Sequence, residues 1–168
     1  MKLQHKSLVF FFLFFISTFS FAQKKVTSPA ETVSGKINGA TITIKYGSPS
    51  VKGRAIWGAL VPYDKVWRAG ANDATTFETD KTITIEGKQL PAGKYSFFVI
   101  SNENESIIIF NKEAKQWGSY DYKASSDQLR VTVKNENGDA LVEKLEYKIM
   151  ETRIELLWEK LIIGFEVK

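Results

Sequence analysis

Apolar and polar residues alternate over most of the chain that follows Val33. The alternation is clearest in seven segments: 41–46, 76–80, 82–86, 129–134, 144–149, 153–158 and 163–167. A period of two predicts β-strands that bury one face, and no window of helical length shows a sustained period of 3.6 residues. We therefore expect an all-β protein in which the apolar members of each segment, such as Ile42 and Ile44, point inward.

Two further segments, 94–101 and 106–112, carry apolar residues at consecutive positions. Strands that are apolar on both faces belong in the middle of a sheet that is covered from both sides. The residues 101–105 between them are polar and fit the tip of a hairpin. We expect these two strands to pair with each other.

Turn signals separate the remaining strands. Asn137-Gly138 is the strongest hairpin signal in the chain, and it predicts a turn between 129–134 and 144–149. Leu90–Gly93 predicts another turn, and 112–122 a helical turn followed by an aromatic loop. Roughly eight or nine short antiparallel strands favour a single β-sandwich or jelly-roll-like domain, with a partly closed β-barrel as the alternative.

The first 22 residues have the layout of a cleaved signal peptide. A basic start precedes the apolar run 8–16, and Ser20-Phe21-Ala22 forms a small-x-small cleavage pattern. The run is too short to span a bilayer as a stable helix, although an uncleaved anchor is an alternative. We expect an exported protein, periplasmic or secreted, with a polar leader at 23–32 and one domain at 33–168.

Two residue types that carry much of enzyme chemistry are missing after the predicted signal. The chain has no cysteine, and its single histidine is His5. Catalysis by Ser-His-Asp or Cys-His and the usual zinc sites are therefore excluded from the mature protein. We expect no metal and no cofactor, and an exported chain without disulfides must be held together by packing alone.

The formal net charge of +4 includes two lysines of the predicted signal, so the mature chain is closer to neutral. Charges of both signs are interleaved, and no run of basic residues occurs. A nucleic-acid partner is therefore not expected, and neither is a membrane span in the mature chain.

The segment 46–75 departs from the alternation and is rich in glycine and proline, so its backbone must turn often. It also carries side chains that suit a small polar, anionic or glycan-like ligand: Arg54, Tyr63, Trp67, Arg68 and Asn72. Arginines bind a carboxylate or phosphate through bidentate hydrogen bonds, and Arg54 is the candidate anchor for an anion. We treat the five as candidate ligand-binding residues.

Other interpretations of this segment remain open. It could be structural, with its own small apolar core and with Arg54 and Arg68 paired to Asp64 and Asp73. It could belong to a hydrolase, in which Asp64 and Asp73 supply the two carboxylates that a glycosidase needs. The protein could also be a structural or protein-interaction module of the cell envelope.

A second aromatic cluster occupies 116–122. If Trp117 and Tyr120 are exposed, their rings offer a stacking platform for a glycan or an aromatic ligand, so both are candidate ligand-binding residues. If they are buried, they cover one end of the sandwich. The sequence leaves open whether this cluster lies beside the segment 46–75.

Several motifs resemble the signature of a known family. They are Tyr-Gly-Ser-Pro-Ser-Val-Lys-Gly-Arg at 46–54, Val-Trp-Arg-Ala-Gly-Ala-Asn-Asp-Ala-Thr at 66–75, Leu-Pro-Ala-Gly-Lys-Tyr-Ser at 90–96 and Gln-Trp-Gly-Ser-Tyr-Asp-Tyr at 116–122. Over nearly its whole mature length the chain resembles an exported bacterial group catalogued as domain of unknown function twenty-nine eleven. The resemblance implies export and a single domain, and it assigns no catalytic role to any residue.

Overall fold

The computed structural model describes residues 28–168, and the predicted signal peptide lies outside them. Within that range the chain forms strands, one 3-10 turn at Ala124–Ser126 and no α-helix. The strands are β1 (Ala30–Ile37), β2 (Ala40–Gly47), β3 (Val66–Trp67), β4 (Thr75–Thr79), β5 (Ile83–Ile85), β6 (Lys88–Leu90), β7 (Gly93–Ser101), β8 (Glu105–Asn111), β9 (Asp127–Ile149) and β10 (Arg153–Glu166). All of their pairings are antiparallel, so the prediction of an all-β antiparallel protein is confirmed.

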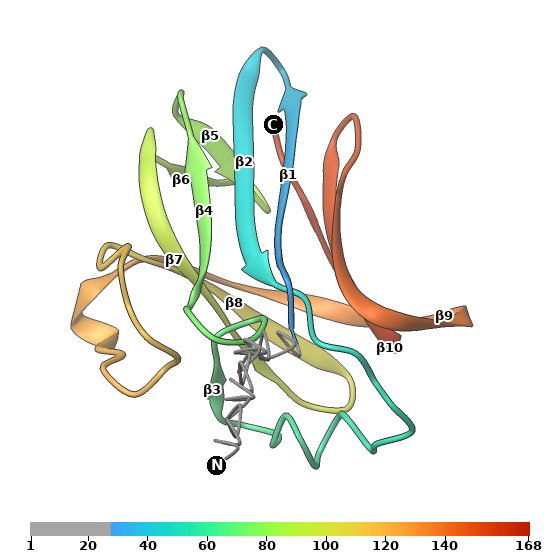
Figure 1. Cartoon of the computed structure of the whole chain (residues 1–168). Coiled ribbons are helices and arrows are strands. Elements are labelled where there is room, and N and C mark those ends of the chain that lie inside the picture. Colours follow the sequence, from blue (N-terminus) through green and yellow to red (C-terminus); the bar gives the residue numbers. More distant parts are fainter. Residues whose placement is uncertain (1–27) are drawn as a thin grey trace, which may run out of the picture.

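One large sheet forms the body of the molecule. Its strands follow the order β1-β2-β4-β7-β8-β9-β10, and β3 pairs with β7 beside this path. Figure 1 shows that the sheet curls like half of a barrel, so that β1 lies near the second half of β9. The two-stranded sheet of β5 and β6 packs against this curl and is joined to β10 by a bridge between Ile85 and Val167.

An aromatic core fills the inside of the curled sheet. Phe97 lies at its centre, with ring centroids 5.3 Å from Phe110 and 5.9 Å from Phe165. Each fully buried ring stabilises the fold by about 1.5–3 kcal/mol. Most of the residues predicted to point inward are buried, among them Ile42, Ile44, Ile83, Ile85, Leu145, Leu156 and Ile163, whereas Tyr46, Leu129 and Ile149 are half-buried.

The strands β7 and β8 are buried on both faces, as predicted. Val99 and Ile108 belong to the main core, whereas Phe98 and Ile109 point to the opposite face. That face is covered by β3 and by Tyr122, whose ring centroid lies 5.1 Å from that of Phe98. The two strands form the expected hairpin, and its polar tip is at 102–104.

The hairpin predicted at Asn137-Gly138 is wrong. Both residues lie inside β9, which continues without interruption to Ile149. The chain turns later, between the end of β9 at Ile149 and the start of β10 at Arg153. Asn137 pairs with Leu161 of β10, and this pairing holds the segment around Asn137 extended. The two strands expected at 153–158 and 163–167 are one continuous strand, β10. It is continuous because both of its halves pair with β9.

The Asn-Gly pair that does form a turn is Asn38-Gly39, between β1 and β2. Both residues have positive φ, at 49° and 77°, as a type I′ hairpin turn requires. The alternation predicts a strand at 41–46, which is β2, and it predicts neither β1 nor this turn. β1 also begins at Ala30, so the last residues of the segment predicted as a leader belong to the sheet.

Candidate functional site

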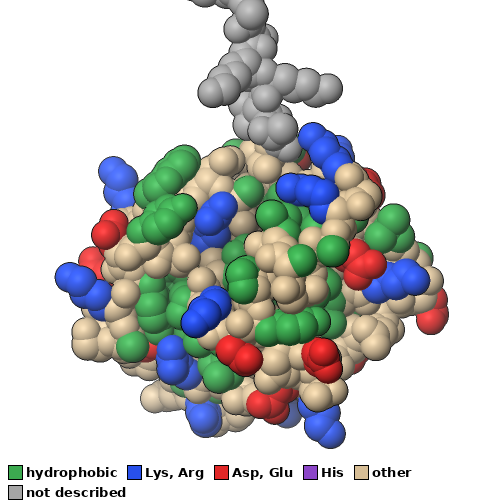
Figure 2. Space-filling view, turned by 90° about the horizontal axis from the view of Figure 1, so that it is seen from below, with side chains coloured by type: hydrophobic (Ala, Val, Ile, Leu, Met, Phe, Trp, Pro, Cys, Tyr) green, Lys and Arg blue, Asp and Glu red, His purple; other side chains and the backbone are tan. Residues whose placement is uncertain are grey.

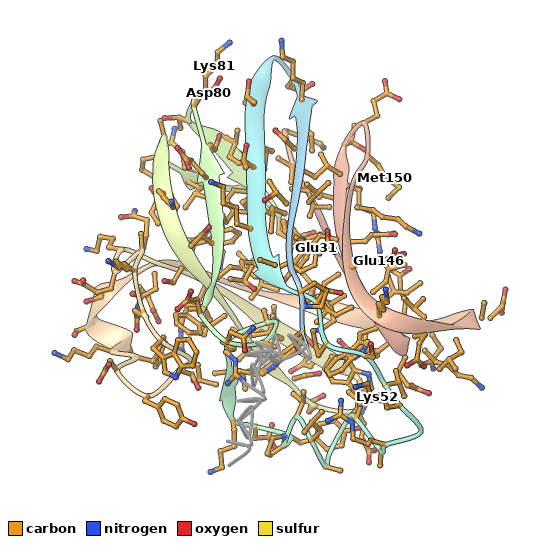
Figure 3. The ribbon with its side chains drawn as sticks, in the orientation of Figure 1. Glu31, Lys52, Asp80, Lys81, Glu146 and Met150 are labelled. Atoms are coloured by element: carbon orange, nitrogen blue, oxygen red, sulfur yellow. The ribbon has the colours of Figure 1, made fainter. Side chains whose placement is uncertain are left out.

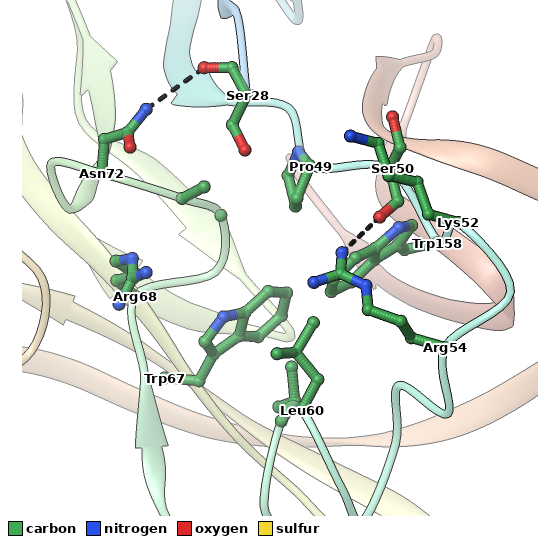
Figure 4. A pocket seen from close by; sticks show the side chains of 13 residues that line it. Ser28, Pro49, Ser50, Lys52, Arg54, Leu60, Trp67, Arg68, Asn72 and Trp158 are labelled. Atoms are coloured by element: carbon green, nitrogen blue, oxygen red, sulfur yellow. Dashed lines mark hydrogen bonds between the residues drawn. The ribbon is translucent and has the colours of Figure 1, made fainter. Parts of the chain in front are cut away.

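The segment between β2 and β4 encloses a pocket of about 460 Å³ at one end of the curled sheet (Figure 4). We call it the arginine pocket. Its lining includes four of the predicted residues together with Lys52, Leu60 and Trp158; the four are Arg54, Trp67, Arg68 and Asn72. Figure 2 looks at the molecule from this end and shows basic and apolar side chains close together on the surface.

A bulge in β9 holds the wall of the pocket that carries Arg54. The register between β9 and β10 shifts on either side of the pair Val142–Glu159, where β9 uses more residues than β10. The displaced part of β9 pairs with the segment after β2: Val51 N donates to Glu143 O at 2.8 Å, and Leu145 N donates to Pro49 O at 2.9 Å. The bulge thus frees backbone groups of β9 to form ladder-like hydrogen bonds with the wall that carries Arg54.

The guanidinium of Arg54 is oriented by the main chain of the same wall. Its Nε donates to Val51 O at 3.0 Å, and its Nη2 donates to Ser50 O. These acceptors are neutral carbonyls, so the positive charge is fixed in place without being neutralised. Figure 4 shows Arg54 on one side of the pocket and Arg68 on the other, with Trp67 between them.

The opposite wall depends on two glycines. Ala71 N donates to Gly47 O at 3.1 Å, so the end of β2 touches the segment after Arg68. A Cβ on Gly47 would collide with the carbonyl of Ala71, and a Cβ on Gly70 would lie 3.0 Å from Gly47 O. Only glycine allows this approach of two backbones, which explains part of the glycine content of the segment.

Arg68 is the most unusual residue of the pocket. It is partly buried, and its side chain makes no hydrogen bond and no ion pair with any residue that the structure describes. Its Nε is shielded from solvent and has no partner. Partly buried guanidinium groups normally donate to carboxylates or carbonyls, whereas the terminal Nη1 and Nη2 groups of Arg68, which lines the pocket, have no acceptor among the described residues.

The proposed structural pairing of the arginines is wrong for the described residues. The ion pairs of residues 28–168 involve Arg130, Lys148 and Arg153, and neither Arg54 nor Arg68 takes part. Asp73 forms a backbone bridge with Trp117 instead. Asp64 lies in a turn with φ of 59°, and its N–H donates to Ser101 O.

No carboxylate is found among the residues that line the arginine pocket, counted over the described part of the chain. A glycosidase needs two carboxylates on either side of one bond, and this pocket offers cations only. The described residues also contain no group of three or more acidic, histidine or cysteine side chains that could hold a metal ion. The charged side chains that line the pocket, among the described residues, are all cationic.

Lys52 is a third cation of the pocket. It is exposed, has φ of 49°, and its backbone N–H donates to Glu143 Oε1 at 3.0 Å. Figure 3 places Lys52 at the pocket end of the molecule, whereas Asp80 and Lys81 lie at the opposite end. Asn72 and Ala69, with φ of 66° and 52°, are held in the same left-handed region. Such strained positions cluster at binding sites more often than elsewhere.

Two tryptophans, Trp67 and Trp158, line the apolar part of the pocket, and Trp57 packs against both. The rings of Trp67 and Trp158 are stacked with centroids 5.9 Å apart, and Trp57 meets Trp67 edge-on at 5.6 Å. The indole nitrogen of Trp158 is buried and has no partner among residues 28–168. Leu60 adds an exposed aliphatic side chain to the lining of the pocket.

The second aromatic cluster lies next to the central segment. Gly118 N donates to Asn72 O at 3.2 Å, and Ala74 N donates to Gln116 O at 3.0 Å. The side chains of Trp117 and Tyr120 are 60% and 82% exposed. Neither side chain lines the arginine pocket, but the loop that carries them is hydrogen-bonded to Asn72, which does line it. Tyr63 is also outside the lining and packs against Gly58.

Two tyrosines below the pocket stay protonated. Burial raises the pKa of the Tyr147 hydroxyl well above its ordinary value of 10.0, and this hydroxyl donates to Ala69 O at 2.7 Å. Burial also raises the pKa of Tyr46, an effect that Tyr147 N–H opposes and that Glu31 and Glu146 reinforce. Neither phenol is an effective base at neutral pH.

Sequence reasoning missed Lys52, Leu60 and Trp158 as pocket residues. Trp158 alternates with polar neighbours in a strand, and this pattern identifies core residues, so nothing local distinguishes a core tryptophan that also borders a pocket. Lys52 carried a weak signal, because it precedes Gly53 in a turn close to Arg54.

Comparison with known proteins matches residues 28–167 to the family described as a protein of unknown function (DUF2911). The chain belongs to this family. No curated protein and no solved structure matches the chain. Among the residues that the structure describes, no helix has the length and apolar character needed to cross a membrane.

Proposed function

We propose that this DUF2911 protein binds a small anionic molecule in the arginine pocket. The charged group of the ligand, a carboxylate or a phosphate, lies between Arg54 and Arg68. Its ring or aliphatic part packs on Trp67 and Leu60. A ligand of this kind uses both properties of the pocket, the fixed positive charge and the apolar wall.

The observation that carries the proposal is the unpaired guanidinium of Arg68. A partly buried charged donor without an acceptor costs the folded state about 1–3 kcal/mol or more. A protein that keeps such a group gains from it only when a ligand supplies the acceptor oxygens. Arg54 supports the proposal, because main-chain carbonyls hold its guanidinium without cancelling its charge.

Isothermal titration calorimetry with benzoate and phenyl phosphate tests the proposal, with benzamide as a neutral molecule of matching shape. We expect both anions to bind and benzamide to bind at least about tenfold more weakly, a difference of about 1.4 kcal/mol. Added salt should weaken the binding of the anions, because part of the attraction is electrostatic. Equal binding of benzoate and benzamide would contradict the proposal.

The variant Arg68→Met separates a binding role from a structural one. It should abolish benzoate binding while leaving the free energy of unfolding unchanged or raising it by about 1 kcal/mol, because an unsatisfied buried donor is removed. The matched control is Arg130→Met, since Arg130 already pairs with Asp127. The control should bind benzoate normally. If Arg68→Met unfolds more easily and still binds benzoate, Arg68 is a structural residue and the proposal fails.

A further inference from the structure

We infer that the ligand is an acidic oligosaccharide, with its acid group in the arginine pocket and further sugar units in two adjoining hollows. This inference rests on the proposed function and names the class of ligand. The middle hollow, of about 320 Å³, shares Ala71 and Asn72 with the arginine pocket. The far hollow, of about 330 Å³, shares Asp73, Ala74, Thr76 and Lys94 with the middle one.

The border between the arginine pocket and the middle hollow is polar. Asn72 Nδ2 donates to Ser28 O at 3.1 Å across this border, as Figure 4 shows. Asn72 Oδ1 has no hydrogen-bond partner among residues 28–168. A ligand that passes over this border therefore meets a free acceptor, which a sugar hydroxyl can donate to.

The middle hollow mixes the two signs of charge. Lys45 and Lys94 line it together with Glu31 and Asp73, and none of the four forms an ion pair within the described residues. Carboxylates accept hydrogen bonds and ammonium groups donate them. A hydroxyl group donates and accepts at the same time, so a ligand rich in hydroxyls suits this lining.

The far hollow holds an unused acceptor. Gln116 Nε2 donates to Asn111 Oδ1 at 3.2 Å and to Glu113 O at 2.8 Å, and these two bonds fix the amide. Gln116 Oε1 is buried and has no partner in the described part of the chain. The arginine pocket thus contributes the Nη donors of Arg68, and the far hollow is lined by the polar side chains of Lys94, Lys115 and Gln116, as expected for a ligand with an acid at one end and hydroxyls at the other.

Sugar fits the far hollow better than peptide. A peptide usually binds along a free strand edge, but the strands that line this hollow, β4 and β7, are each paired on both sides. Trp117 follows Gln116 directly and is 60% exposed. An exposed indole offers a flat apolar face on which the C–H face of a sugar ring can pack.

Calorimetry with uronic acids tests the inference on the intact mature chain. The probes are glucuronate and aldotriouronate, a trisaccharide in which one terminal glucuronate is attached to xylobiose, with neutral xylotriose as the control sugar. The acidic trimer should bind about tenfold or more tightly than glucuronate, and xylotriose should bind more weakly than the acidic trimer. The variants Trp117→Ala and Lys94→Met should lose the advantage of the trimer and keep the affinity for the monomer.

Lys88→Met is the matched control, because Lys88 is exposed on β6 and lines none of the three hollows. Thermal melting followed by circular dichroism verifies that each variant is folded. If trimer and monomer bind equally, the oligosaccharide inference is overturned while anion binding stands. If no uronic acid binds and benzoate still does, the oligosaccharide inference is likewise overturned and anion binding stands. If benzoate also fails, the proposed function itself is wrong.

Discussion

Single residues around the arginine pocket are placed by backbone contacts that leave no room for another atom. Gly47 and Gly70 lie where the end of β2 meets the segment after Arg68, and Ala71 N–H joins the two backbones. The tight contact orients the wall that carries Arg68, which then has no protein partner of its own. The contact between these backbones therefore positions a charged side chain that lines the arginine pocket.

The variant Gly47→Ala should destabilise the protein by about 3 kcal/mol, because the added Cβ collides with a backbone carbonyl that cannot move freely. Gly53→Ala is the matched control in the same loop, since no atom lies within 4 Å of its added Cβ and only its φ of 67° opposes the change. Gly53→Ala should lower the free energy of unfolding by about 1 kcal/mol. Urea unfolding measures both, and equal costs would show that the contact at Gly47 relaxes.

At the scale of elements, β9 connects the fold to the site. Its first part pairs with β8, its bulge supports the wall that bears Arg54, and its last part pairs with the start of β10. An Asn-Gly pair in the middle of such a strand is tolerated because the pairing with β10 holds the backbone extended at Asn137. The free energy by which an Asn-Gly dipeptide favours a turn is small compared with the free energy gained when a long strand pairs with its neighbour.

The two Asn-Gly pairs should therefore respond in opposite directions to the same substitution. Gly39→Ala should destabilise by about 1–2 kcal/mol, because φ at this position is 77°. Gly138→Ala should be neutral or stabilise by about 0.5–1 kcal/mol, since alanine is less costly than glycine inside a strand. The nearest atom to the new Cβ, Ile162 Cδ1, lies at an ordinary 3.4 Å. Destabilisation of both variants to the same extent in urea would contradict the assignment.

At the scale of the whole molecule, the curled sheet closes over a core that includes a fully buried phenol. Tyr147 extends from β9 to donate to Ala69 O, so one buried hydrogen bond joins the barrel-like sheet to the backbone beneath the arginine pocket. The ring of Tyr46 meets it at 4.8 Å. Stability of the sheet and geometry of the pocket are therefore coupled through this pair.

This arrangement predicts a loss of stability at alkaline pH. The pKa of Tyr147 is higher in the folded state than its unfolded value of about 10, so the folded state holds the proton more tightly. Its contribution is complete below pH 10 and disappears as the pH rises through the folded pKa. Tyr147→Phe should lose about 1 kcal/mol at neutral pH with the hydrogen bond, and its stability should then fall less steeply above pH 10.

Urea midpoints measured between about pH 8 and pH 11 test this prediction. The wild type should keep some alkaline sensitivity in any case, because burial also raises the pKa values of Tyr46, Tyr95 and Tyr122. Parallel curves for the wild type and Tyr147→Phe would show that Tyr147 does not contribute to the pH dependence.

The alternation of apolar and polar residues by itself indicated most of the strand segments, their inward faces and the unusual segment 46–75, but it gave neither β1 nor the full lengths of β9 and β10. These features are local, because a strand buries every second residue wherever it pairs. The hydrophobic pattern of 94–101 likewise determined that β7 lies in the middle of the sheet. The residues Arg54, Trp67, Arg68 and Asn72 could be selected in advance because planar and aromatic groups gathered among glycines.

Only the tertiary structure decided what these residues face. It left Arg68 without a carboxylate, brought Trp158 from the last strand into the pocket, and joined the loop at Gln116 to the segment after Asn72. It also kept β9 extended through Asn137. Each of these outcomes depends on contacts between residues far apart in the chain, and a local pattern carries no information about which distant strand will supply the partner.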